Sequence, residues 1–235
     1  MSEEHGCLSV AGPKSRDVLR QITRSPLDNA SFPWLSHRDI DVAGKAVRAL
    51  RISYAGELGW EFHTPVRSMP EVYDAILTAG RNFGIENYGS FALNSMRLEK
   101  AFHASSELTN EVTLPEADVM RFLNLDKGEF IGREATLQST KSPRRWKCVC
   151  LVVDAHDADC WGGETVYWAG SVAGFVSSGG YGHRVKKSLA FAYVNSECSE
   201  VGTELHVDIL GERRRANILN GPAYDPSNNR PRADG

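Results

Sequence analysis

The stretch RISYAGELGWEF, residues 51–62, predicts a β-hairpin. We expect one strand over residues 47–54, a turn at the two glycines of the stretch, and a second strand after the turn. Alternation along the second strand turns its tryptophan and phenylalanine toward the core, and it turns Glu61 and His63 to the opposite face. The hairpin therefore directs a carboxylate away from the core.

Three segments around the hairpin have helical periodicity. They are residues 15–22, which follow a Gly-Pro start, residues 70–83, and a segment that begins at Ser90. Gly84 suits the end of the second helix because glycine readily adopts the left-handed conformation of a C-cap. The third helix carries Arg97 beside its apolar stripe, so we expect Arg97 to be able to reach the edge of a cleft without being buried among the apolar side chains.

The last third of the chain changes to short alternating strands, which predict a small antiparallel barrel. An Ala169-Gly170 turn separates two of these strands. Residues 103–142 are mainly polar, and KSPRR at 141–145 is the clearest linker signal. We therefore predict an α+β portion over residues 1–142 and a C-terminal antiparallel β-barrel over residues 143–235, with a frayed tail from residue 230.

Composition excludes several classes of protein. The 235 residues are 41% hydrophobic and 24% charged, which is ordinary for a globular protein with two units. A net charge of -3, with one dense basic cluster at Arg213–Arg215, argues against binding of nucleic acid by the barrel. No stretch approaches the roughly 20 apolar residues of a membrane span. We expect a location in the cytoplasm, or in the mitochondrial matrix of a eukaryote.

The five cysteines are an odd number in a chain too large to need disulfides, so reduced thiols are expected. Cys148 and Cys150 share one face of a predicted strand, and neither a C-x-x-C spacing nor a second ligand pair accompanies them. We therefore expect them to pack in a core, and we assign no metal ligand. Glycine-rich dinucleotide and phosphate-binding motifs are also missing from the sequence, so we expect no flavin site in this chain.

Several runs accompany the hairpin in a fixed order: VAGPKSR at 10–16, NSMRLEK at 94–100, LTNEVT at 108–113, DKGEFIGREA at 126–135 and SSGGYGH at 177–183. Together they resemble the glycine-cleavage T-protein (aminomethyltransferase) family, and most closely the C-terminal folate-binding part of the bacterial dimethylglycine and sarcosine dehydrogenases. The resemblance implies an α+β fold, in which a partial T-protein-like (ferredoxin-like) α/β layer precedes a small antiparallel β-barrel. It also implies tetrahydrofolate as the cofactor.

The resemblance implies three folate-binding residues. Glu61 stands at the second glutamate of the family's Tyr-x-Gly-Glu-x-Gly-x-Glu motif, where a carboxylate accepts two pterin N–H groups; such a pairing contributes roughly 1.5–3 kcal/mol where water is excluded. Tyr54 opens the motif and would line the site, although a cross-strand packing role is the alternative. Arg97 would hold the folate carboxylates or organise Glu61, against the alternative of a surface ion pair.

Other positions are less specific. Tyr181 and His183 lie in a barrel loop that leans over the cleft in the family, so the resemblance implies a lid, with a simple turn as the alternative. The chain is one residue shorter than the family near residues 102–107, and His103 in this segment is more typical of a solvated than of a catalytic histidine. The family's catalytic aspartate matches no residue here, so the catalytic residue is unknown.

The implied function is that of the C-terminal part of a tetrahydrofolate-dependent aminomethyl or one-carbon transferase. Such an enzyme forms 5,10-methylenetetrahydrofolate from a methylated amine or aminomethyl donor. Because the upstream catalytic region is expected to be absent, we expect the chain alone to be inactive. It would act with a separate chain carrying the N-terminal or flavin portion, or self-associate. The alternative is a non-catalytic folate-binding or regulatory subunit.

Overall fold

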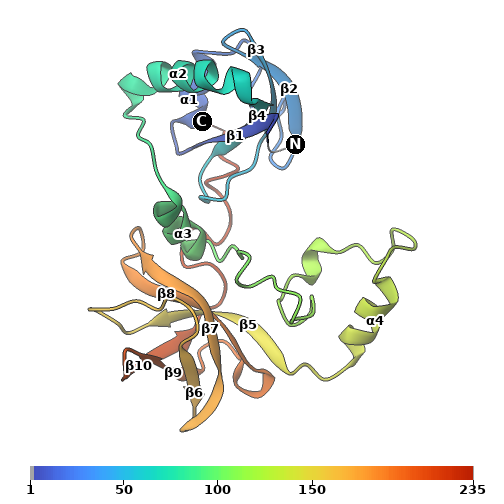
Figure 1. Ribbon diagram of the computed structural model, residues 1–235, viewed down its shortest axis with the longest axis vertical. Coiled ribbons are helices and arrows are strands. Elements are labelled where there is room, and N and C mark those ends of the chain that lie inside the picture. Colours follow the sequence, from blue (N-terminus) through green and yellow to red (C-terminus); the bar gives the residue numbers. More distant parts are fainter. Residues whose placement is uncertain (1–2, 235) are drawn as a thin grey trace. The chain divides into compact units, whose positions relative to one another are not determined.

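The computed structural model describes residues 3–234 and divides into two compact units, Met1–Leu93 with Asp225–Gly235, and Asn94–Tyr224 (Figure 1). A four-stranded antiparallel sheet with helices forms the first unit, and a closed six-stranded barrel dominates the second. The predicted fold class is confirmed. The domain boundary between residues 142 and 143 stays a prediction. Among residues 3–234, no helix combines the length and apolar character that crossing a bilayer requires.

The sheet of the first unit has the order β1-β4-β3-β2. Its strands are β1 (His5–Ala11), β2 (His37–Val42), β3 (Lys45–Leu50) and β4 (Gly59–Pro65). Figure 1 shows two helices, α1 (Ser15–Arg20) and α2 (Met69–Gly80), in the same unit as this sheet. Their apolar side chains share one core with the sheet. Trp60 and Phe62 are completely buried in this core, so the alternation predicted for the second strand of the hairpin is confirmed.

The first strand of the predicted hairpin is wrong in its extent. β3 ends at Leu50, and the chain then leaves the sheet, with Arg51 turned inward to donate a hydrogen bond to the Phe32 carbonyl at 2.7 Å. β3 pairs antiparallel with β4, as the predicted hairpin requires, and it also forms a tight hairpin with β2 through Ala43 and Gly44, both of which have positive φ. The alternation alone did not reveal β1 and β2, because both strands carry several polar residues.

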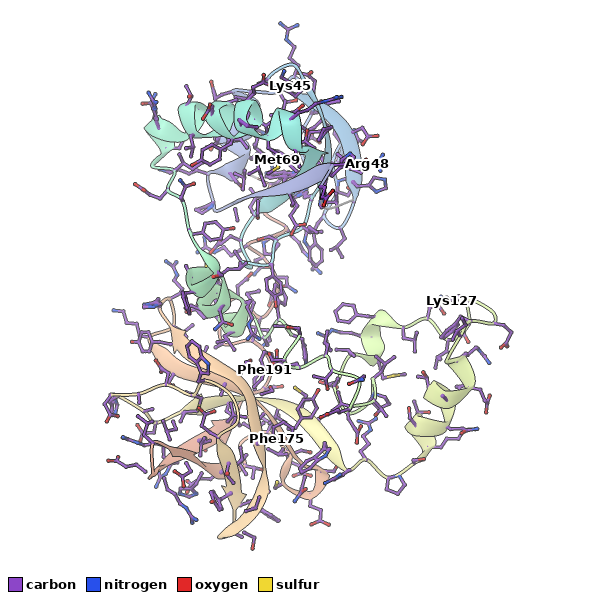
Figure 2. All side chains as sticks on the ribbon, viewed as in Figure 1. Lys45, Arg48, Met69, Lys127, Phe175 and Phe191 are labelled. Carbon is purple, nitrogen blue, oxygen red and sulfur yellow. The ribbon has the colours of Figure 1, made fainter. Side chains whose placement is uncertain are left out.

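The predicted end of the second helix at Gly84 is confirmed. A 3-10 turn, η1 (Val66–Ser68), precedes α2, and another, η2 (Arg81–Phe83), follows it. Gly84 then adopts the left-handed conformation with a φ of 74°. At its other end, α2 lies close to β1, and the side chain of Met69, labelled in Figure 2, occupies the space that a Cβ atom on Gly6 would need. A larger residue at position 6 would displace the end of this flexible side chain.

The described part of the C-terminal tail, residues 230–234, is held by hydrogen bonds, contrary to the predicted fraying. Arg51 donates to the carbonyls of Pro231 and Ala233, and the backbone N–H of Asn29 donates to the Asp234 carboxylate at 3.1 Å. The Arg232 guanidinium also lies 4.6 Å from the centre of the Trp34 ring. These long-range contacts hold the tail in the first unit.

The barrel of the second unit closes in the order β10-β5-β8-β7-β6-β9. Its strands are β5 (Trp146–Val153), β6 (Thr165–Trp168), β7 (Ser171–Gly182), β8 (Lys187–Asn195), β9 (Glu204–Ile209) and β10 (Glu212–Ile218), with a 3-10 turn, η4 (Ser196–Cys198), between β8 and β9. Ala169 and Gly170 form the predicted turn at positive φ. Phe175 and Phe191 mark the adjacent strands β7 and β8 in Figure 2.

The two faces of β5 have different surroundings. Val149, Leu151 and Val153 belong to the large core inside the barrel, whereas Cys148 packs with Leu98, from α3 (Ser90–Glu99), in a second cluster that Cys150 borders. Packing is therefore the role of these cysteines, as predicted. Between α3 and the barrel, the described chain contains η3 (Met120–Phe122) and α4 (Arg133–Lys141), and α4 has no buried residue.

Candidate functional site

A pocket of about 610 Å³ lies in the first unit at the free edge of β1. Glu61 and Tyr54 both line it, so the structure brings two predicted folate-binding residues to one cavity. The apolar side of the pocket includes Val18, Ile76 and Phe83. The Glu61 side chain is 26% exposed, which leaves its carboxylate accessible to a ligand.

Local packing fixes the position of Glu61. The preceding Gly59 pairs closely with β1, and a Cβ atom there would lie 2.8 Å from the Val10 carbonyl oxygen. Trp60 is buried, and the guanidinium groups of Arg16 and Arg51 each lie 5.7 Å from the centre of its ring. Because Gly59 is packed against β1 and Trp60 is buried, the backbone just before Glu61 is fixed in position. The Glu61 carboxylate therefore projects from a well-packed strand.

Three potential metal ligands meet on the face of the sheet opposite Trp60. Cys7 lies directly across from His63 in the β1–β4 register, and Ser9 lies across from Glu61. The Cys7 Sγ atom is 3.8 Å from His63 Nε2, and His63 Nε2 is 3.6 Å from Glu61 Oε2. Partial burial, followed by the negative charge of Glu61, raises the pKa of the Cys7 thiol. The Glu-x-His spacing on a strand is a sequence signal for part of this cluster, but the cysteine is distant in the chain.

Arg97 is buried, and it is not among the residues that line the pocket of the first unit. It is 2% exposed and forms an ion pair with Glu107 at 3.0 Å. Its other nitrogen atoms donate to Asn94 at 2.9 Å and to Ser178 at 2.8 Å. Contact between Arg97 and folate remains a prediction, but the guanidinium already has partners within the second unit.

Glu107 is a residue that the sequence interpretation missed. It is fully buried and accepts hydrogen bonds from Ser178, Ser177 and the Ala104 amide, at 2.6, 2.7 and 2.8 Å. Burial would raise the pKa of this carboxyl, but these hydrogen bonds and Arg97 together lower it below its ordinary value. Glu107 is therefore held as a carboxylate, and it connects the segment after α3 to β7 of the barrel.

Tyr181 and His183 lie at the end of β7 and in the turn after it, with their rings in an edge-to-face contact at 5.1 Å. The backbone here is tied to α3: Ser95 donates to the Tyr181 carbonyl at 2.6 Å, and Glu99 accepts from the amides of Arg184 and Val185 at 2.6 and 3.0 Å. A lid role for the two aromatic side chains remains a prediction.

The fold defines a protein with an antiparallel α/β unit and a closed barrel, and two family models match this arrangement. The model of the GCVT N-terminal domain matches residues 1–127, and the model of the glycine cleavage T-protein C-terminal barrel domain matches residues 147–225. The chain belongs to the glycine cleavage T-protein family.

Individual relatives agree with this assignment. The chain is 40% identical to human mitochondrial dimethylglycine dehydrogenase over 98% of its own length and 27% of the relative's length. It is 30% identical to an aminomethyltransferase of Saccharopolyspora erythraea, over 95% of this chain and 61% of that one. The solved structure of the glycine cleavage system aminomethyltransferase T from Bartonella henselae has the same fold, with a TM-score of 0.84 at 22% identity, over 94% of this chain and 60% of that one. The chain thus spans only part of each relative.

Proposed function

We propose that this chain provides the pterin-binding portion of a tetrahydrofolate-dependent aminomethyl or one-carbon transferase. The observation that carries the proposal is the shared position of Glu61 and Tyr54 in the pocket of the first unit. Its volume of about 610 Å³ lies within the range of roughly 300–1,000 Å³ that is usual for small-molecule sites. Family membership supports the choice of folate as the ligand.

The donors and acceptors of the pocket suit a reduced pterin. Its N–H edge would donate to the Glu61 carboxylate, and its flat ring would contact Tyr54 and the apolar wall of the pocket. A charge-assisted pair of this kind contributes roughly 1.5–3 kcal/mol, which corresponds to a change in affinity of about 10- to 100-fold.

Calorimetric titration with tetrahydrofolate tests the binding step. We expect Glu61→Gln to weaken binding by about 10- to 100-fold, because an amide loses the charge and one acceptor. Glu71→Gln is the matched control, since Glu71 lies on α2 in the same unit and its side chain is 58% exposed in an ion pair with Lys45. Equal tetrahydrofolate affinities for wild type and Glu61→Gln would remove Glu61 from the site.

In the proposed reaction, N5 of tetrahydrofolate attacks the one-carbon unit of an aminomethyl or iminium donor, giving 5,10-methylenetetrahydrofolate and a released amine. Such a transfer depends on alignment, because a misplacement of about 1 Å can reduce the rate by roughly a hundredfold. The chain spans 61% of the aminomethyltransferase relative, and no described residue has been assigned as the catalytic aspartate. We therefore propose that a further segment or a separate chain completes the active site.

Formation of 5,10-methylenetetrahydrofolate tests this second step. The assay compares the 235-residue chain alone with the chain supplied with the part of the aminomethyltransferase relative that it does not match. We expect turnover only in the second case. Turnover by the chain alone would contradict the proposal, and tetrahydrofolate binding without turnover in either case would favour the non-catalytic folate-binding subunit.

A further inference from the structure

We propose that Cys7, Glu61 and His63 form a binding site for a zinc ion on the exposed face of the first unit's sheet. Each residue offers one ligand atom, and the three atoms lie within 4.8 Å of one another. A thiolate, an imidazole and a carboxylate are the three ligand types that zinc takes from proteins. The proposal rests on this geometry alone and does not depend on folate binding.

Two of the three separations between the ligand atoms are close to those around a bound ion, and the third, between Cys7 and Glu61, is within 4.8 Å. Zinc bonds of about 2.3 Å to sulfur and about 2.0–2.2 Å to nitrogen and oxygen place tetrahedral ligand atoms roughly 3.4–3.6 Å apart. The Cys7 Sγ to His63 Nε2 distance is 3.8 Å, and the His63 Nε2 to Glu61 Oε2 distance is 3.6 Å. Small side-chain rotations therefore bring all three atoms to one centre.

The backbone holds the ligands in place before an ion arrives. β1 and β4 keep an unbroken antiparallel register over their whole length, from His5↔Pro65 to Ala11↔Gly59. Cys7 and His63 are directly opposed in this register, and Glu61 follows His63 on the same face by the alternation of a strand. Ligands on paired strands are more precisely placed than ligands on loops.

Charge and access also suit zinc. A thiolate and a carboxylate together balance the two positive charges of the ion, and the thiol proton is released to solvent when the Zn–S bond forms. Cys7 is exposed and the other two side chains are partly exposed, so the fourth coordination position is open to water. Three protein ligands with one open position is the arrangement of zinc sites that also bind an exogenous ligand.

Cobalt substitution tests the site on the 235-residue chain after treatment with a chelator. Wild-type protein titrated with Co²⁺ should bind one ion and show thiolate-to-cobalt charge-transfer absorption, and Zn²⁺ should displace the cobalt. Loss of an outer-shell partner usually weakens metal binding by 10- to 100-fold, so loss of a direct ligand in Cys7→Ser or His63→Ala should weaken Zn²⁺ binding by at least about 100-fold. Cys7→Ser should also abolish the charge-transfer band.

His37→Ala is the matched control, because His37 is an exposed histidine on β2 of the same sheet. It should leave the affinity and the absorption unchanged. A wild-type spectrum without thiolate charge transfer, or equal Zn²⁺ affinities for wild type and His63→Ala, would overturn the proposal. Circular dichroism verifies that each variant is folded, and Glu61→Gln provides a third ligand variant.

Competition separates this proposal from the proposed function. Zinc engages the same Glu61 carboxylate as the pterin, so saturating Zn²⁺ should weaken tetrahydrofolate binding by wild type at least 10-fold. His63→Ala should bind tetrahydrofolate normally and lose this sensitivity to zinc, because the residues that line the folate pocket include Cys7 and Glu61 but not His63. Normal folate binding without any zinc binding refutes the metal site alone, whereas zinc binding without folate binding refutes the folate site alone.

Discussion

Glu61 in the first unit and the Arg97–Glu107 pair in the second use their charges in opposite ways. In the first unit, Glu61 lines a pocket and retains an accessible carboxylate. In the second, Arg97 and Glu107 are removed from solvent and hydrogen-bonded to neighbouring segments. A charged group whose hydrogen-bonding capacity is used inside a unit contributes to its structure, whereas one with spare capacity at a pocket is available to a ligand.

The largest expected effect is the loss of the buried ion pair. Arg97→Met should destabilise the second unit by about 3–5 kcal/mol, because it leaves the Glu107 carboxylate buried without its cation. Urea unfolding monitored by circular dichroism measures the change. Arg215→Met is the control, since its pair with Glu204 is exposed, with side-chain accessibilities of 61% and 49%, and should cost less than about 1 kcal/mol. Similar losses for the two variants would contradict the structural role of Arg97.

The pH dependence of stability sharpens the same contrast. Because the folded-state pKa of Glu107 is lowered, its stabilising contribution is complete above the unfolded pKa of about 4.3 and is lost as the pH falls through the folded value. Wild type should therefore be more stable to urea than Glu107→Gln at neutral pH, and this difference in stability should disappear in acid. Urea midpoints measured from neutral to acidic pH should differ by a constant amount above about pH 5 and converge below it. A constant difference at every pH would show that the carboxylate charge is not responsible.

The cysteines of the barrel should contribute only packing. Burial raises the pKa of the Cys150 thiol to about 12, so this group remains a neutral thiol at neutral pH. Cys148→Ala combined with Cys150→Ala should lower the free energy of unfolding by about 1–2 kcal/mol in total, through loss of apolar contacts. Urea unfolding gives the energy. Metal analysis tests the alternative. A zinc ion that is bound to the wild type and lost from this double variant would contradict the packing role.

The smallest expected effect on stability is at the pocket. Glu61→Gln should change the free energy of unfolding of the first unit by less than about 0.5 kcal/mol, because the side chain is partly exposed and a glutamine retains its shape. The same variant should have the large effect on tetrahydrofolate binding described above. Strong destabilisation by Glu61→Gln would assign the carboxylate a structural role like that of Glu107 and remove the contrast between the units.

Local sequence patterns predicted those parts of the fold that depend only on a residue and its neighbours in the chain. The turn at Ala169-Gly170 and the helix terminus at Gly84 followed from backbone preferences. The burial of Trp60 and Phe62 followed from alternation along one strand. The extent of the strand before them was wrong, because Arg51 is drawn inward by carbonyl groups from distant segments, which no local pattern records.

The candidate site shows the same division. Glu61 was found from its motif and its place on a strand, but its partners in the proposed zinc site depend on the pairing of β1 with β4. Arg97 was found as a residue of interest, but its burial depends on Glu107 and on Ser178 of β7. The tail is expected to fray because terminal residues are poorly ordered unless other segments hold them, yet its backbone carbonyls accept hydrogen bonds from Arg51.

The sequence by itself determined the family, the α+β and barrel classes, the direction of the Glu61 side chain and the packing role of Cys148 and Cys150. Each of these depends on a motif or on the period of a strand or helix, which are properties of neighbouring residues. Only the tertiary structure decided that Arg97 is enclosed, that the tail is held, and that Cys7 meets Glu61 and His63. Those outcomes require segments far apart in the chain to meet, and burial and charge pairing are set only when they do.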